Sequence, residues 1–160
     1  MLQVAACVGF AGTHSISEIL SGIPGVYVSH GSQNIRARTP IGVNNQTPEA
    51  FLADMRELGK EYDNVVAIHT LFPPALLKNM CNMHGVEYRV IVRQPNEQVK
   101  SCYSWMLQKL QQGDESLRAQ VMALAQQCKG HVEPTLQNAV YMAALTRIMT
   151  FNLAAITQGA

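Results

Sequence analysis

The chain has 160 residues, of which 48% are hydrophobic, and a formal net charge of +1. Such a composition is typical of an ordinary globular protein, and the length predicts a single domain over residues 1–160. A net charge this close to zero gives no general attraction to nucleic acids or acidic membranes. Any anion-binding site must therefore be local.

Cysteine usage and hydropathy bear on where the protein works. The cysteines lack CxxC spacing, and the histidines at positions 30, 84 and 131 lack ligand-like spacing, so we predict reduced, buried thiols and no metal site. The N-terminus lacks the basic region of a signal peptide, and polar residues interrupt the most apolar segment, residues 139–156. We therefore expect a cytoplasmic protein with no membrane span.

Residues 3–20 predict a strand, a glycine turn and a helix. The apolar run Val4–Val8 is followed by the turn Gly9–Gly12, and a helical pattern starts near Thr13. The free N–H groups of a helix's first turn attract anions, so this order is typical of phosphate binding. The lysine that a nucleotide-hydrolysing loop, GxxxxGK[ST], carries after its second glycine is absent here. A strand-to-helix turn without a ligand is the alternative.

The first two thirds of the chain alternate between strand and helix patterns, and the last third is helical. We predict strands near residues 3–8, 26–28, 64–68 and 87–92, and a helix that begins at Thr47-Pro48-Glu49. This alternation predicts an α/β fold, in which one parallel sheet has helices on both faces. The polar stretch of residues 29–46 carries Arg36 and Arg38, which either contact substrate or belong to a solvated loop.

Polar groups follow three of the predicted strands. The glycine turn comes after Val8, His69 comes after Ile68, and Arg93 comes after Val92. Ligands of open parallel sheets bind beyond the carboxyl ends of the strands, so the three groups are expected at one edge.

These residues form a pattern that resembles the sulfotransferases that use 3′-phosphoadenosine-5′-phosphosulfate. Gly12-Thr13-His14 matches the family's first loop, and Arg93 with Ser101 matches its second motif, an arginine followed eight residues later by a serine. His69, in the segment IHTLFPPALLK, falls within a residue of the family's catalytic histidine. The resemblance covers roughly residues 3 to 112.

The resemblance implies a three-layer fold like that of the P-loop NTPases, with a helical C-terminal third. It implies transfer of a sulfuryl group to a hydroxyl or amine of a small molecule or glycan, with His69 as general base and no metal. The donor's 5′ side would be held by Gly12, Thr13, His14 and Ser15, and its 3′-phosphate by Arg93 and Ser101, with Arg36 and Arg38 near the acceptor. We expect no nucleic-acid partner, and a possible homodimer through the C-terminal helices, residues 117–156.

The sequence departs from the family in two places. Phe10 stands where the family's first loop has a lysine or arginine, and the family's closing Arg-Lys-Gly loop has no counterpart after residue 112. A non-catalytic nucleotide-binding or interaction module is therefore the main alternative. A P-loop kinase is a weaker one, because it needs a loop lysine. Individually, His69 could be structural, His14 could cap its helix, and Arg93 could cap a helix or form an ion pair.

Overall fold

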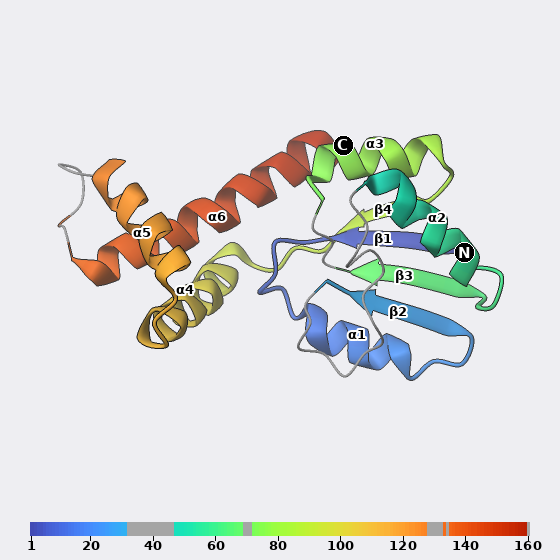
Figure 1. Cartoon of the computed structure of the whole chain (residues 1–160), viewed down its shortest axis with the longest axis horizontal. Helices are drawn as coiled ribbons and strands as arrows, with labels where there is room; N and C mark the ends of the chain where they lie inside the picture. The colour runs from blue at the N-terminus through green and yellow to red at the C-terminus, as the bar shows by residue number, and fades with distance from the viewer. Residues whose placement is uncertain (32–46, 69–71, 128–132, 134, 160) are drawn as a thin grey trace. The chain divides into compact units, whose positions relative to one another are not determined.

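A computed structural model describes residues 1–31, 47–68, 72–127, 133 and 135–159. Its contacts divide the chain into two compact units, one of Met1–Val92 with Ala154–Ala160 and the other of Arg93–Leu153. Figure 1 labels the strands and helices of the described residues, which are, in order, β1 (Leu2–Ala6), α1 (Thr13–Ser21), β2 (Val26–His30), α2 (Pro48–Leu58), β3 (Asn64–Ile68), α3 (Pro74–Met83), β4 (Glu87–Val90), α4 (Pro95–Gln111), α5 (Glu115–Gln127) and α6 (Leu136–Gly159).

The first unit is built on a four-stranded sheet in the order β2-β3-β1-β4, and all of its strand pairs are parallel. At the centre, Val4 of β1 lies opposite Ala67 of β3 and Tyr88 of β4. The predicted α/β fold with one parallel sheet is thus confirmed, as is the helical C-terminal region.

Three strand boundaries differ from the prediction. β1 ends at Ala6, its last partner being Val90 of β4, because the chain beyond it turns into left-handed backbone at Gly9. β4 ends at Val90 rather than at residue 92. β2 continues to His30, because Ser29 and His30 pair with the end of β3 although their side chains are polar. Strand pairing uses backbone groups, so a polar side chain does not prevent it.

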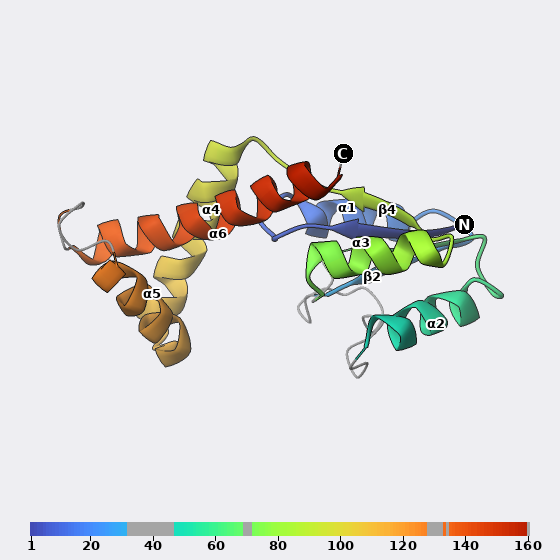
Figure 2. The same cartoon turned by 90° about the horizontal axis from the view of Figure 1, so that it is seen from above.

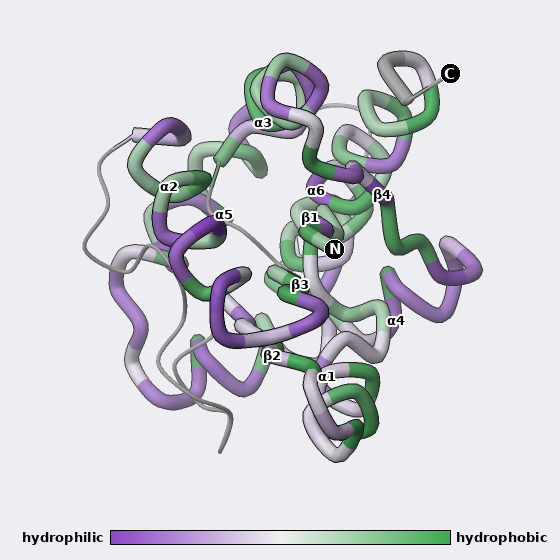
Figure 3. Tube along the Cα trace, turned by 90° about the vertical axis from the view of Figure 1, so that its right-hand side faces the viewer, coloured by the Kyte–Doolittle hydropathy of each residue, from purple (hydrophilic) through white to green (hydrophobic). Residues whose placement is uncertain are grey.

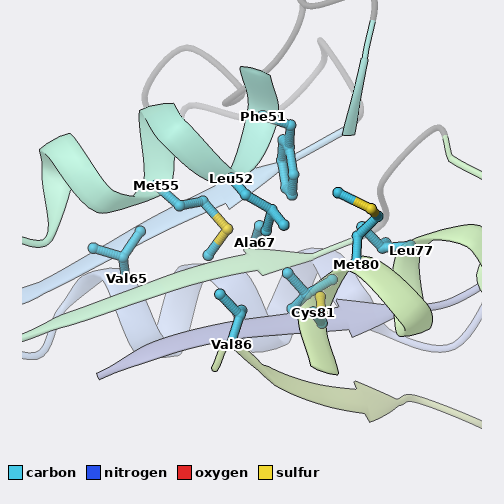
Figure 4. Close-up of a cluster of buried hydrophobic side chains, with 10 residues drawn as sticks. Phe51, Leu52, Met55, Val65, Ala67, Leu77, Met80, Cys81 and Val86 are labelled. Carbon is cyan, nitrogen blue, oxygen red and sulfur yellow. The ribbon is translucent and has the colours of Figure 1, made fainter. Parts of the chain in front are cut away.

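Helices cover both faces of the sheet, as Figures 2 and 3 show, with α2 and α3 on one face and α1 on the other. The alternation of side chains along the strands explains this arrangement. One face of the strands packs against α2 and α3, and the side chains of this cluster, drawn in Figure 4, are Val4, Phe51, Leu52, Met55, Val65, Ala67, Leu77, Met80, Cys81 and Val86. The opposite face is smaller, and there Ala5, Val28, Val66 and Ile68 are buried beneath Ile16 and Leu20 of α1.

The N-terminus of α2 has the predicted cap. The hydroxyl oxygen of Thr47 accepts a hydrogen bond from the N–H of Ala50 at 3.2 Å, and Pro48 starts the first turn. In α3, Leu77 and Met80 are buried, whereas Leu76 is 45% exposed. Residues 76 and 77 are 100° apart around a helix, so one of them turns away from the sheet.

The second unit consists of helices. The apolar stripe of α4 is buried at Val99, Cys102, Met106 and Leu110, with Tyr103 half-buried. Gln98 is also buried. The cost of burying its amide is offset by a hydrogen bond, which its Oε1 accepts at 3.1 Å from Nδ2 of Asn152 on α6. A second contact between these helices places the guanidinium of Arg147 over the ring of Trp105, 5.8 Å from its centroid.

α6 is the one helix among the described residues that is long and apolar enough to cross a membrane, over Leu136–Thr157. Only 28% of its most apolar stretch is buried within the structure. Core helices of water-soluble proteins pass the same test of length and composition. The expected absence of a membrane span, the cytoplasmic location and the homodimer remain predictions.

Candidate anion-binding site

The sheet topology marks one position at the carboxyl ends of its strands. β1 and β3 are neighbours, but the helix after β1 covers one face of the sheet and the helix after β3 covers the other. Where neighbouring connections leave toward opposite faces, a crevice opens that binds ligands in open α/β sheets. The glycine turn that follows β1 therefore begins at this position.

The turn after β1 has an unusual backbone. Gly9, Phe10 and Gly12 have φ angles of 89°, 60° and 75°. Glycine adopts such angles without steric cost, whereas a side chain such as that of Phe10 does so rarely. Among the described residues Phe10 is the only non-glycine residue with positive φ. The backbone conformation of Phe10 is thus imposed by the fold of the turn and not by the residue's own preference.

The turn delivers the chain to the N-terminus of α1. Gly12 is the N-cap, and the N–H of Ile16 makes the first helical bond, to the carbonyl of Gly12 at 3.2 Å. The N–H groups of Thr13, His14 and Ser15 precede that bond and have no acceptor inside the helix. No acidic residue lies in this first turn, so nothing there opposes an anion.

The surface at the N-terminus of α1 is open. Gly12, His14 and Ser15 are exposed, whereas Thr13 is buried. A Cβ atom built on Gly12 would meet no atom of the described residues within 4 Å. A ligand can therefore approach the backbone closely at Gly12. Gly12 is needed there for its positive φ and not because a side chain would clash.

His30 belongs to this site and was missed by the sequence analysis, which found only that it lacked metal-ligand spacing. It ends β2, is 2% exposed, and its Nε2 lies 2.9 Å from the hydroxyl oxygen of Thr13. Its ring centroid is also 4.7 Å from that of His14. The signal in the sequence was the pair Ser29-His30, directly after the apolar run of β2, which is the same strand-end position that singled out His69.

Three predicted site residues, His69, Arg36 and Arg38, lie outside the described residues. Their assigned roles remain predictions.

Arg93 and Ser101 belong to the second unit, where Arg93 lies two residues before α4 and Ser101 lies within it. The Arg93 side chain is 46% exposed, and its Nη2 lies 3.8 Å from Oε2 of Glu97. Oε1 of Glu97 also accepts a hydrogen bond at 3.1 Å from Nζ of Lys100. Glu97 and Ser101 are four residues apart on α4, so the carboxylate that contacts Arg93 also lies on the same face of the helix as Ser101. An anion held by Arg93 must therefore compete with Glu97.

Cys81 and Cys102 are poor candidates for a nucleophile. Both are free, buried thiols, and Cys7 is buried as well. Burial raises the pKa of Cys81 from the ordinary value of 9.0 to about 11. Burial likewise raises the pKa of Cys102 to about 11, although nearby Arg147 acts in the opposite direction. Thiols that stay protonated at neutral pH are inert.

The described residues contain no group of three or more His, Cys, Asp or Glu side chains that could hold a metal. Comparisons of the chain with protein-family models, with curated proteins and with solved structures found no match.

Proposed function

We propose that the chain is a sulfotransferase-like protein of the P-loop type, which transfers a sulfuryl group from 3′-phosphoadenosine-5′-phosphosulfate to a hydroxyl or amine of a small molecule or glycan. The observation that carries the proposal is the exposed N-terminus of α1. It follows a left-handed Gly12, lacks acidic residues, and comes directly after β1, where the sheet's connections diverge. A phosphosulfate group carries the charge and the acceptor oxygens that such a helix end binds.

The donor's two ends are assigned to different residues. The N–H groups of Thr13, His14 and Ser15 hold the 5′ phosphosulfate. The guanidinium of Arg93 holds the 3′-phosphate, with one added hydrogen bond from the Ser101 hydroxyl. Support for the second assignment comes from the exposure of both side chains, although Arg93 pairs with Glu97, which a phosphate would have to displace.

In the reaction, the acceptor oxygen or nitrogen attacks sulfur as the bond from sulfur to the bridging phosphate oxygen breaks. His69 takes the proton of the attacking group, and 3′-phosphoadenosine-5′-phosphate leaves. A general base of this kind contributes about 10²–10⁴ in rate.

Phe10 favours a second candidate, a nucleotide-binding module without activity. The family's loop cation stabilises charge on the leaving phosphate, and a phenyl ring cannot do so. Loss of one such group costs about 10²–10³ in rate. Binding of the nucleotide without turnover would identify this second function.

A ligand-dependent rise in melting temperature tests the binding step. We expect 3′-phosphoadenosine-5′-phosphate to raise the melting temperature and ATP, which lacks the 3′-phosphate, to raise it less. Arg93→Ala should abolish the rise, and Glu97→Gln should enlarge it by removing the competing carboxylate. Arg118→Ala is the matched control, because Arg118 also forms an exposed ion pair, with Glu115 at 3.6 Å. An equal rise in wild type and Arg93→Ala would contradict the assignment of Arg93.

A transfer assay with labelled donor and a panel of acceptors tests the chemistry. His69→Ala should remove transfer and keep nucleotide binding, because a base acts mainly in the transition state. Unchanged turnover in this variant would remove His69 from the mechanism.

A further inference from the structure

A buried histidine supports the first turn of α1. His30, the last residue of β2, is 2% exposed, and Thr13, the first residue of α1, is 3% exposed. Nε2 of His30 and Oγ1 of Thr13 are 2.9 Å apart, so a buried hydrogen bond joins the end of an edge strand to the start of the helix. The tautomer of the imidazole decides which of the two groups donates.

The same first turn has two further contacts. The hydroxyl of Ser17 donates to the carbonyl of Thr13 at 2.8 Å within the buried side of α1. On the exposed side, the ring of His14 lies against that of His30, with centroids 4.7 Å apart and planes tilted by 58°. His30 therefore contacts the side chains of the first two helical residues, whose N–H groups belong to the proposed anion site.

We propose that His30 is a positioning residue for the anion site, which acts through Thr13. By fixing the Thr13 side chain inward, it fixes the direction of the N–H groups at the start of α1 and leaves ligand binding there to the backbone. This inference rests on the proposed function of the α1 N-terminus.

A packing role alone does not explain this choice of residues. Burying an imidazole and a hydroxyl is unfavourable unless the two are paired, and an aliphatic pair would fill the space without that cost. The neighbouring positions on this side of the sheet, Val28 and Ile68, are indeed aliphatic. A polar pair instead gives a defined orientation, because a hydrogen bond is directional and apolar contact is not.

The test measures the dissociation constants of inorganic pyrophosphate and of 3′-phosphoadenosine-5′-phosphate by calorimetry, on variants whose folding is confirmed by circular dichroism. His30→Phe and Thr13→Val each remove the hydrogen bond and keep most of the volume. We expect each to weaken pyrophosphate binding by about tenfold, and the double variant to be no weaker than either single one. His30→Gln, whose amide nitrogen can replace Nε2, should restore binding. His84→Gln is the control. His84 is the C-cap of α3 and not a residue of the α1 turn, so this substitution should leave both dissociation constants unchanged.

The outcomes separate the inference from the proposed function. Unchanged pyrophosphate binding in folded Thr13→Val, or fully additive losses in the double variant, would overturn the inference, and so would a wild-type protein that binds neither anion. If His30→Phe does not fold, Thr13→Val and His30→Gln still decide. Binding of pyrophosphate with the expected losses, but no binding of the nucleotide, would support the inference and reject the sulfotransferase proposal. Nucleotide binding that no variant weakens would overturn the inference and support the sulfotransferase proposal.

Discussion

Phe10 is the residue that most directly limits the proposed chemistry. It occupies left-handed backbone with φ of 60° in the turn that leads to α1. Lysine tolerates such backbone about as well as phenylalanine does, because both have an unbranched Cβ. The position can therefore be changed to a cation without adding backbone strain.

Phe10→Lys should raise the rate of sulfuryl transfer by about a hundredfold, because the lysine supplies a positive charge that stabilises the negative charge developing on the leaving phosphate. Phe10→Gln is the matched control, since it also removes the ring and lengthens the side chain but adds no charge. The measurement is turnover of labelled donor with the best acceptor of a screen. Equal rates in the two variants would show that charge at this position is not what limits turnover.

At this scale, the sequence predicted part of the local geometry of the candidate site. Gly12 and Thr13 were found because glycine before a helical pattern has a specific backbone meaning. His30 was missed because its role depends on the approach of β2 to α1, and 17 residues of sequence separate it from Thr13. The carboxylate of Glu97 beside Arg93 was readable from the four-residue spacing, but that spacing alone does not tell whether the arginine turns toward it.

Among the elements, α3 shows how a helix is held on the sheet. Leu77 is fully buried in the cluster of Figure 4, and its neighbour Leu76 is 45% exposed. The two leucines thus provide a matched pair on one helix turn.

Leu77→Ala should lower the free energy of unfolding by about 2–5 kcal/mol, because it leaves a cavity among close-packed side chains. Leu76→Ala should change it by less than about 1 kcal/mol, because little apolar area is lost to water. Urea denaturation followed by circular dichroism measures both. Comparable losses in the two variants would contradict the orientation of α3.

The elements were more predictable than their ends. Apolar periodicity located the helices and all four strands, since burial of one face requires it. Strand ends depend instead on which partner is available, so β2 gained Ser29 and His30 from pairing with β3. Three consecutive apolar positions, Ala75, Leu76 and Leu77, do not by themselves show which of them faces the sheet.

For the molecule as a whole, the strand order was not predictable from the sequence. Alternating strands and helices require a parallel sheet, but several orders satisfy that rule. The order β2-β3-β1-β4 places β1 and β3 side by side, which is the topological switch point on which the proposed site depends. The division into two compact units was likewise unmarked, since no linker-like segment separates Val92 from Arg93.

Each unit carries a buried thiol whose ionisation is opposed by the fold, Cys81 in the first and Cys102 in the second. In both, burial raises the pKa from 9.0 in the ordinary state to about 11. Between pH 9 and pH 11 the folded state therefore keeps the two thiol protons, whereas the unfolded chain releases them. The stability linked to them is fully present below pH 9 and is lost as the pH rises toward 11. Tyr88 acts in the same direction, because burial, and secondarily Cys81, raises its pKa.

We accordingly expect the free energy of unfolding, measured by urea denaturation under reducing conditions, to fall between pH 9 and pH 11. Each thiol contributes at most about a tenfold change in the unfolding constant per pH unit. Cys81→Ala and Cys102→Ala should each be less stable than wild type at neutral pH, because a buried group is lost, yet should show a shallower fall at alkaline pH. Tyr88→Phe controls for the tyrosine.

Because the two cysteines lie in different units, separate unfolding transitions would each respond to only one of the substitutions, and a single transition would respond to both. A pH dependence that remains unchanged in the double cysteine variant would show that the buried thiols do not hold their protons as the structure requires.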